Sequence, residues 1–411
     1  MENLSPVTYD FPHGGVIYGY PSSALDIVRV SLSFEAGSFY QPQMLVADAA
    51  SKLFSEGTRR CTPQEVAEFL DYRGIMLEKS KDTYTNDISV YMLRKYAHEM
   101  LPMLHEMLTQ PRFAKQEFEV YLSQQRQRIQ MQMQRTNSLA YRYFHQALYG
   151  EEHPLARYAT VEDVDRLSLN TVEDFFYKYF SPNQAHIILS GGFNADMVEQ
   201  CHALFGGTPM GIGDLTQCTV PPSPSSQRRH HVSIPSAQTT IRIGRLLPLS
   251  WNSPDYAPFM VLNTLLGGYF GSRLMCNIRE DKGYTYGVYS ATALGRDDVK
   301  FFLTMDVGND VVHAAVQEAY NEMDRLCQER VSEEELSMVC RYMEGDFIRT
   351  VDGVFERGER FLQMATAGIS EQFTDDYFNA LRTVTPDDIL RLAQQYLTPD
   401  AMFEICVGAG V

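Results

Sequence analysis

No apolar run in this chain of 411 residues reaches the roughly 18 residues that a membrane-spanning helix needs. The first twenty residues contain no basic segment followed by an apolar stretch, so they do not resemble a secretory signal. From these two absences we expect a cytoplasmic protein that does not associate with a membrane.

Paired cysteines and excess positive charge are also missing. The seven cysteines are scattered, and none forms a Cys-x-x-Cys pair, which argues against a disulfide framework or a thiolate zinc site. Lys and Arg number 35 against 52 Asp and Glu, and a net charge of −17 argues against general nucleic-acid binding. The hydrophobic content of 44% and the length favour a globular chain of two or more domains.

An internal repeat is present. Residues 167–193 resemble residues 384–410 at an offset of 217. Each copy starts with a Ser or Thr that can cap a helix, stops at a Ser/Thr-Pro pair, and continues as a short apolar strand. The aligned pairs are Ser168 with Thr385, Tyr179 with Tyr396, Ser181 with Thr398, Pro182 with Pro399 and Gly191 with Gly408.

The starts of the two halves also correspond. Residues 28–34 alternate apolar and polar side chains, which predicts a strand with one buried face, and a helix is expected over residues 44–55. In the second half Ile241 and Ile243 alternate in the same way, with a helix expected over residues 254–266. The strand predicted at residues 87–93 corresponds to one at residues 300–307.

The sequence therefore predicts an α+β chain of two homologous halves. They cover residues 1–205 and 230–411, and residues 206–229, rich in Gly, Pro, Ser and Thr, have the composition of a linker. The alternative is two unrelated α+β domains that are similar by chance.

Residues 265–290 read LLGGYFGSRLMCNIREDKGYTYGVYS. This run, the duplicated halves and a strand–helix segment ending at Gly57-Thr58 resemble the pitrilysin/insulysin family of zinc peptidases, which includes the mitochondrial processing peptidases. The resemblance implies that each half is a sheet with helices packed on one face. It also implies that four such halves, from a partner or a tandem copy, enclose a chamber for peptides.

The zinc motif of that family is absent. Its members carry His-x-x-Glu-His on the first helix, where two His hold zinc and the Glu acts as base. Counting back from Gly57-Thr58, the ligand and base positions fall on Asp48, Ser51 and Lys52, and a slip of one residue offers no His or Glu either.

The third ligand of the family, a Glu on a later helix, is missing as well. The helix expected over residues 118–144 has no acid after Glu119, and it carries Arg126, Arg128 and Arg135 instead. We therefore expect no metal or other cofactor in this chain. The pair His98 and His105 is interpreted as part of a surface helix, and His230-His231 as solvated, because adjacent residues point apart on regular structure.

Arg279 and Tyr286 have the family spacing of an Arg and a Tyr that reach the zinc centre from the facing half. A guanidinium and a phenol suit that role because they stabilise the negative charge that forms on the peptide oxygen. Tyr284 is an alternative source of the phenol. The alternative to this catalytic role is that Arg279 pairs with a surface acid such as Glu280 and that Tyr286 is an ordinary strand residue.

Two further features are candidates for substrate binding. By resemblance, Gly267 and Gly268 belong to a flexible segment that contacts substrate, and alternatively they are left-handed caps at a helix end. The strand at residues 28–34 could also accept an extended peptide along its edge.

Our hypothesis is a zinc-less subunit, inactive alone, of a two-component zinc peptidase. It would bind peptides and supply Arg279 and Tyr286 to a homologous sister chain that bears His-x-x-Glu-His and holds the zinc. The alternatives are a peptide-binding protein without catalysis, alone or as a self-dimer, and a structural core subunit.

Overall fold

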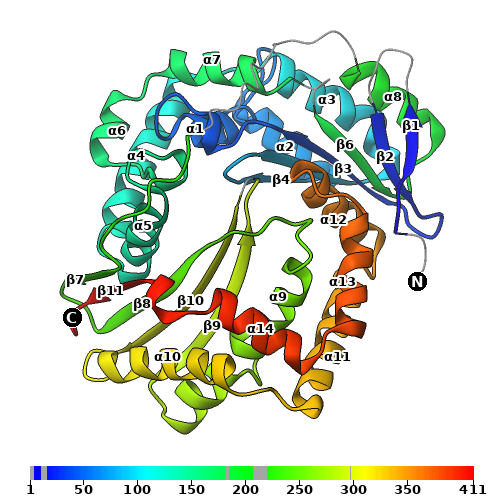
Figure 1. The fold of residues 1–411 in the computed structure, drawn as a ribbon. Helices are drawn as coiled ribbons and strands as arrows, with labels where there is room; N and C mark the ends of the chain where they lie inside the picture. Colours follow the sequence, from blue (N-terminus) through cyan, green and yellow to red (C-terminus); the bar gives the residue numbers. More distant parts are fainter. Residues whose placement is uncertain (1–3, 11–15, 182–184, 207–219, 297) are drawn as a thin grey trace. The chain divides into compact units, whose positions relative to one another are not determined.

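The computed structural model describes residues 4–10, 16–181, 185–206, 220–296 and 298–411. The chain forms two compact units, each with one β-sheet and several helices, so the fold is α+β as predicted (Figure 1). Unit 1 comprises Met1–Gln130, Tyr158–Thr219 and Thr350–Thr366, and unit 2 comprises Met131–Arg157, Val220–Arg349 and Ala367–Val411. Among the described residues, no helix combines the length and the apolarity that a membrane crossing requires.

The sheet of unit 1 has the strand order β1-β2-β6-β3-β5-β4. Its strands are β1 (Val7–Asp10), β2 (Val16–Pro21), β3 (Ile27–Phe34), β4 (Met76–Lys81), β5 (Asn86–Leu93) and β6 (His186–Gly191). Its helices are α1 (Val46–Leu53), α2 (Pro63–Arg73), α3 (Ala97–Thr109), α4 (Lys115–Gln132), α6 (Val161–Arg166), α7 (Leu169–Tyr179), α8 (Ala195–Phe205) and α12 (Val354–Thr366).

The sheet of unit 2 has the strand order β7-β11-β8-β10-β9. Its strands are β7 (Arg229–Ser233), β8 (Gln238–Leu247), β9 (Thr285–Leu294), β10 (Val299–Gly308) and β11 (Phe403–Gly408). Its helices are α5 (Thr136–Tyr149), α9 (Tyr256–Asn263), α10 (Val312–Gln328), α11 (Glu333–Arg349), α13 (Gln372–Thr383) and α14 (Pro386–Tyr396), with π-helical turns η5 (Thr264–Gly268) and η6 (Met275–Asp281).

The repeat read from the sequence is present in both sheets. In unit 1, β6 lies parallel to β2 and antiparallel to β3, and in unit 2, β11 lies parallel to β7 and antiparallel to β8. The side chains of Ser168 and Thr385 cap α7 and α14 by accepting backbone N–H groups, as predicted. Pro182, part of the repeated stop signal, lies outside the described residues.

The compact units do not follow the expected boundaries at residues 205 and 230, because two helices are exchanged. Helix α5, from the first half of the chain, packs against β8 and β11 of unit 2. Helix α12, from the second half, packs against β2, β3 and β6 of unit 1 (Figure 1). Of the expected linker, residues 207–219 lie outside the described part of the chain, so it is not tested there.

This exchange corrects the expectation that β3 has one buried face. Its apolar side chains point into the main core of unit 1, but Arg29, Ser31 and Ser33 on its polar face are buried too. The Arg29 guanidinium lies against α12, where it forms an ion pair with Glu359 and donates to the Phe355 carbonyl oxygen. Helices therefore cover both faces of this sheet, because a helix distant in the sequence supplies the second layer.

Two local expectations are also wrong. Strand β3 is not an edge, because its backbone pairs with β5 on one side and β6 on the other, so no peptide can pair along it. The single helix expected over residues 118–144 is two helices, since α4 ends at Gln132 and α5 begins at Thr136.

Candidate functional site

Helix α1 carries the three positions at which the family motif is degenerate. It is held in unit 1 by small and apolar side chains that pack under the sheet and against α7. Thr58, which follows it, is buried and donates a hydrogen bond of 2.7 Å to Glu106, and Gly57 adopts a positive φ of 93°. This turn fixes the end of the helical segment and supports the count that places the motif at residues 48–52.

The carboxylate of Asp48 is surrounded by donors. It accepts from the Lys81 ammonium at 3.0 Å, from the Tyr121 hydroxyl at 2.9 Å and from the Gln125 side-chain amide at 3.1 Å. Burial, with the nearby Asp48 charge, raises the pKa of Tyr121, so its hydroxyl stays protonated and keeps donating. The group beside the Asp48 carboxylate is therefore the Lys81 ammonium, which cannot ligate a metal ion, whereas a metal site would need further ligands there.

The positions around Asp48 carry further cationic side chains where a zinc site would need ligands. Lys52 pairs with Glu56 at 2.8 Å, and Lys79 reaches the Ser55 hydroxyl at 2.6 Å. Burial, followed by repulsion from Lys52, lowers the pKa of Lys79 to about 8. On α4, Arg126 pairs with Asp165. Since zinc needs several His, Cys or carboxylate ligands, the residues at this position do not fit a zinc ion.

In unit 2, the glycines of η5 have a packing role. A Cβ on Gly267 would lie 2.6 Å from the Ser290 backbone nitrogen, so this glycine lets η5 approach β9 closely. Gly267 is buried, Gly268 is exposed, and neither has a positive φ, which makes the left-handed cap interpretation wrong for both. Substrate binding by Gly267, Gly268 and Tyr284 stays a prediction.

Arg279 and Tyr286 present free polar groups. The Arg279 guanidinium, on η6, lies 4.5 Å from the centre of the Phe270 ring. Within the described part of the chain it forms no ion pair, so the expected alternative, a pair with Glu280, is not found. Tyr286, the second residue of β9, is 93% exposed. Both side chains are thus available to a group outside unit 2.

Residues that the sequence analysis did not single out hold η6 in place. The side-chain amide of Asn277 donates to Glu318 at 3.0 Å and to the buried Glu322 at 2.6 Å, both on α10. Arg273 makes a bidentate pair with Glu335 on α11, at 2.9 and 2.8 Å. No sequence pattern marks these contacts, because the partners lie more than forty residues away.

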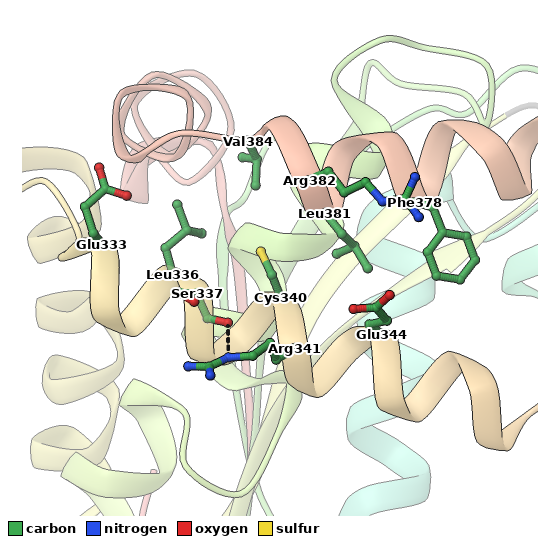
Figure 2. Close-up of a pocket in the computed structure, with 10 residues that line it drawn as sticks. All are labelled: Glu333, Leu336, Ser337, Cys340, Arg341, Glu344, Phe378, Leu381, Arg382 and Val384. Carbon is green, nitrogen blue, oxygen red and sulfur yellow. Dashed lines mark hydrogen bonds between the residues drawn. The ribbon is translucent and has the colours of Figure 1, made fainter.

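A separate pocket of about 290 Å³ lies between α11 and α13. Figure 2 shows Cys340 and Leu381 between the two helices, with two carboxylates and two guanidinium groups around them. Burial raises the pKa of the Cys340 thiol, which disfavours the nucleophilic thiolate. The lining thus places charges of both signs around a thiol that is held away from its reactive form.

Comparisons with known proteins agree with this architecture. The model of the insulinase family (peptidase family M16) matches residues 21–159, and that of the peptidase M16 inactive domain matches residues 166–343. The chain belongs to the M16 family. The family resemblance inferred from residues 265–290 is therefore confirmed.

Individual relatives are distant. A protein named non-peptidase homolog YmxG of Helicobacter pylori is 25% identical, over 63% of this chain and 61% of its own length, so the match spans less than two thirds of that relative. A protein named uncharacterized zinc protease YmxG of Bacillus subtilis is 20% identical, over 85% of this chain and 84% of its own. A crystal structure of a peptidase M16 inactive domain from Pseudomonas fluorescens shares the fold, with a TM-score of 0.83, 20% identity and coverage of 99% and 98%.

Proposed function

We propose that this chain is a non-catalytic M16 subunit that works with a homologous, zinc-bearing sister chain. In this proposal it binds peptides and supplies Arg279 and Tyr286 to the sister chain's active site, in the cytoplasm. The zinc belongs to the sister chain, whose first helix carries His-x-x-Glu-His.

The observation that carries the proposal is the environment of Asp48. The Asp48 carboxylate accepts three hydrogen bonds inside the protein, from Lys81, Tyr121 and Gln125, and faces a positive charge. A zinc-bound water cannot be generated there without the ligands that the family uses. The name of the Helicobacter pylori relative, a non-peptidase homolog, supports the same conclusion.

A second observation supports a role for this chain in another chain's chemistry. Arg279 forms no internal ion pair among the described residues, and the Tyr286 side chain is almost fully exposed. Donors that a protein leaves unpaired and holds in place are suited to stabilise charge that develops in a reaction. Asn277, which lies on the same helical turn as Arg279 and donates to α10, supplies the bracing that such a donor needs.

The experiment mixes the full chain with a purified M16 chain that has the intact motif, and follows cleavage of a quenched fluorescent peptide. We expect no cleavage by this chain alone, and we expect the mixture to cleave the peptide much faster than the sister chain does alone. A sister chain as active alone as in the mixture would contradict the proposal. Peptide binding without acceleration would instead favour a peptide-binding protein, and stable assembly without either would favour a structural subunit.

A further inference from the structure

Three potential metal ligands meet at one edge of the sheet of unit 2. Strands β7 and β11 pair in parallel with His231 opposite Cys406, and Glu404 lies two residues before Cys406 on the same face of β11. One nitrogen, one oxygen and one sulfur atom from these three side chains lie within 4.8 Å of one another. His231 is expected from the sequence to be solvated, and its side chain is indeed partly exposed, but its Nε2 atom also lies 3.0 Å from a Glu404 oxygen. No spacing along the chain could show that contact, because Glu404 lies 173 residues away.

The three side chains differ in exposure in a way that suits an ion site. Glu404 is 5% exposed and Cys406 is 1% exposed, whereas the His231 side chain keeps 39% of its surface. Two ligands are thus anchored inside the protein, and the third borders solvent. Zinc sites with three protein ligands keep their fourth position open for water, and an open position on the His231 side meets that requirement.

The distances are close to those of tetrahedral zinc. Zn–N and Zn–O bonds of about 2.1 Å and a Zn–S bond of about 2.3 Å separate neighbouring ligand atoms by about 3.4–3.7 Å. The His231 Nε2 atom lies 3.0 Å from a Glu404 oxygen, and the widest separation in the cluster is within 4.8 Å. Zinc binding would therefore require side-chain rotations that bring the most widely spaced atoms up to about 1 Å closer together.

The charges of the cluster also balance. A thiolate, a carboxylate and a neutral imidazole around Zn²⁺ give a net charge of zero, so the ion would neutralise a carboxylate that is now buried. The other groups near Glu404 are the Tyr320 hydroxyl from α10, which donates to it, and Arg229 at 3.7 Å. The Arg229 side chain is 73% exposed, so it can turn to solvent, and Tyr320 can support Glu404 as an outer partner.

We propose that His231, Glu404 and Cys406 form a zinc site that ties β7 to β11. Zinc replaces the hydrogen bond between His231 and Glu404 and takes the place of the thiol proton of Cys406, which passes to solvent. The site differs from the family's catalytic position, since α1 belongs to unit 1 and the three ligands to unit 2. It is independent of the proposed function, because no peptide or sister chain takes part.

The test uses the full chain, stripped with a chelator and kept reduced. Zn²⁺ is titrated in competition with a chromophoric chelator, and Co²⁺ is titrated separately to detect the thiolate-to-cobalt absorption band. We expect one equivalent of zinc per chain and a cobalt band that is lost in Cys406→Ser. Losing an outer partner costs about 10–100-fold in metal affinity. The zinc affinity of Tyr320→Phe should therefore fall by about that factor, and the zinc affinity of His231→Gln should fall by more.

Matched controls separate this site from unspecific binding. His230→Gln changes the neighbouring residue, whose side chain points to the other face, and Cys327→Ser removes a half-buried thiol elsewhere. Both should bind zinc like the unchanged protein, as should Asp48→Ala. Absence of stoichiometric zinc binding, or full binding by both Cys406→Ser and His231→Gln, would overturn the proposal. Should Cys406→Ser fail to fold, the half-exposed His231 still provides the test.

Discussion

Helix α1 in unit 1 and the segment from α9 to β9 in unit 2 follow equivalent strands, β3 and β8, but use their polar groups in opposite ways. In the first segment Asp48 has three donors from its own unit. In the second, Arg279 contacts only an aromatic ring among the described groups, and Tyr286 is exposed.

Under the proposed function, the two copies of the repeat contribute in different ways. Groups that are satisfied inside a unit stabilise the fold, whereas donors held without an internal acceptor remain available to a reacting group. Substitutions near α1 should therefore change the stability of the protein and leave catalysis by an assembled complex unchanged. Substitutions at Arg279 and Tyr286 should do the reverse.

The strongest test of this contrast is the loss of the two donors. In a complex with a zinc-bearing sister chain, Arg279→Ala and Tyr286→Phe should each lower single-turnover cleavage by about 10²–10³-fold, or about 3–4 kcal/mol. Peptide affinity should change much less, because the oxygen charge exists only in the transition state. The cleavage rate of Arg279→Lys should be little higher than that of Arg279→Ala, since an ammonium lacks the planar fork of a guanidinium.

The control for that test is Arg273, six residues earlier. Its bidentate pair with Glu335 points to a structural role, so Arg273→Met should lower stability more than turnover. Unchanged cleavage rates in both Arg279→Ala and Tyr286→Phe would mean that this chain supplies no catalytic groups.

The packing of η5 can be tested next. Gly267→Ala should destabilise the chain by about 2–3 kcal/mol, because the added carbon meets the backbone of β9 and overpacking carries that cost. Gly268→Ala should cost under about 1 kcal/mol, since its new contact at 3.1 Å is with the Thr264 side chain. Urea unfolding of both variants measures the difference, and equal losses would contradict the close approach of η5 to β9.

The sheet of unit 1 contains an acid that should make its stability depend on pH. Burial raises the pKa of Asp87 to about 6, against hydrogen bonds from Ser33 and Thr85 that lower it. Between about pH 4 and 6 the folded state then binds more protons than the unfolded state, so stability falls as pH rises. Relative to Asp87→Asn, the unchanged protein should lose on the order of 2 kcal/mol across this range. The measurement is the free energy of unfolding of both proteins at pH 4 and pH 7. The same difference between the two proteins at both pH values would contradict the raised pKa of Asp87.

The effect expected at Asp48 is smaller than that at Asp87. Asp48→Ala should lower the free energy of unfolding by about 1 kcal/mol, because Lys81 is partly exposed and the Tyr121 hydroxyl keeps the Leu45 carbonyl oxygen at 3.3 Å. Cleavage by the assembled complex should stay unchanged. A large loss of cleavage in this variant, with assembly intact, would contradict the conclusion that groups near α1 affect stability and not catalysis.

Much of the fold was predictable from local patterns. The alternation at residues 28–34 marked β3, and the offset of 217 placed β6 and β11 together with the helix caps at Ser168 and Thr385. These features depend on neighbouring residues, which a sequence displays directly. The break between α4 and α5 was missed because residues 133–135 contain neither Gly nor Pro.

The absence of the zinc motif from α1 and the Arg279–Tyr286 spacing could be read from the sequence alone, because each depends on residue identity within one short segment. Only the tertiary structure decided that Lys81 and Gln125 reach Asp48, that α12 buries the polar face of β3, and that His231 meets Cys406. Each of these contacts joins residues between 33 and 330 positions apart. Such pairs form when strand register and helix packing fix both partners, and no local preference of the chain encodes that choice.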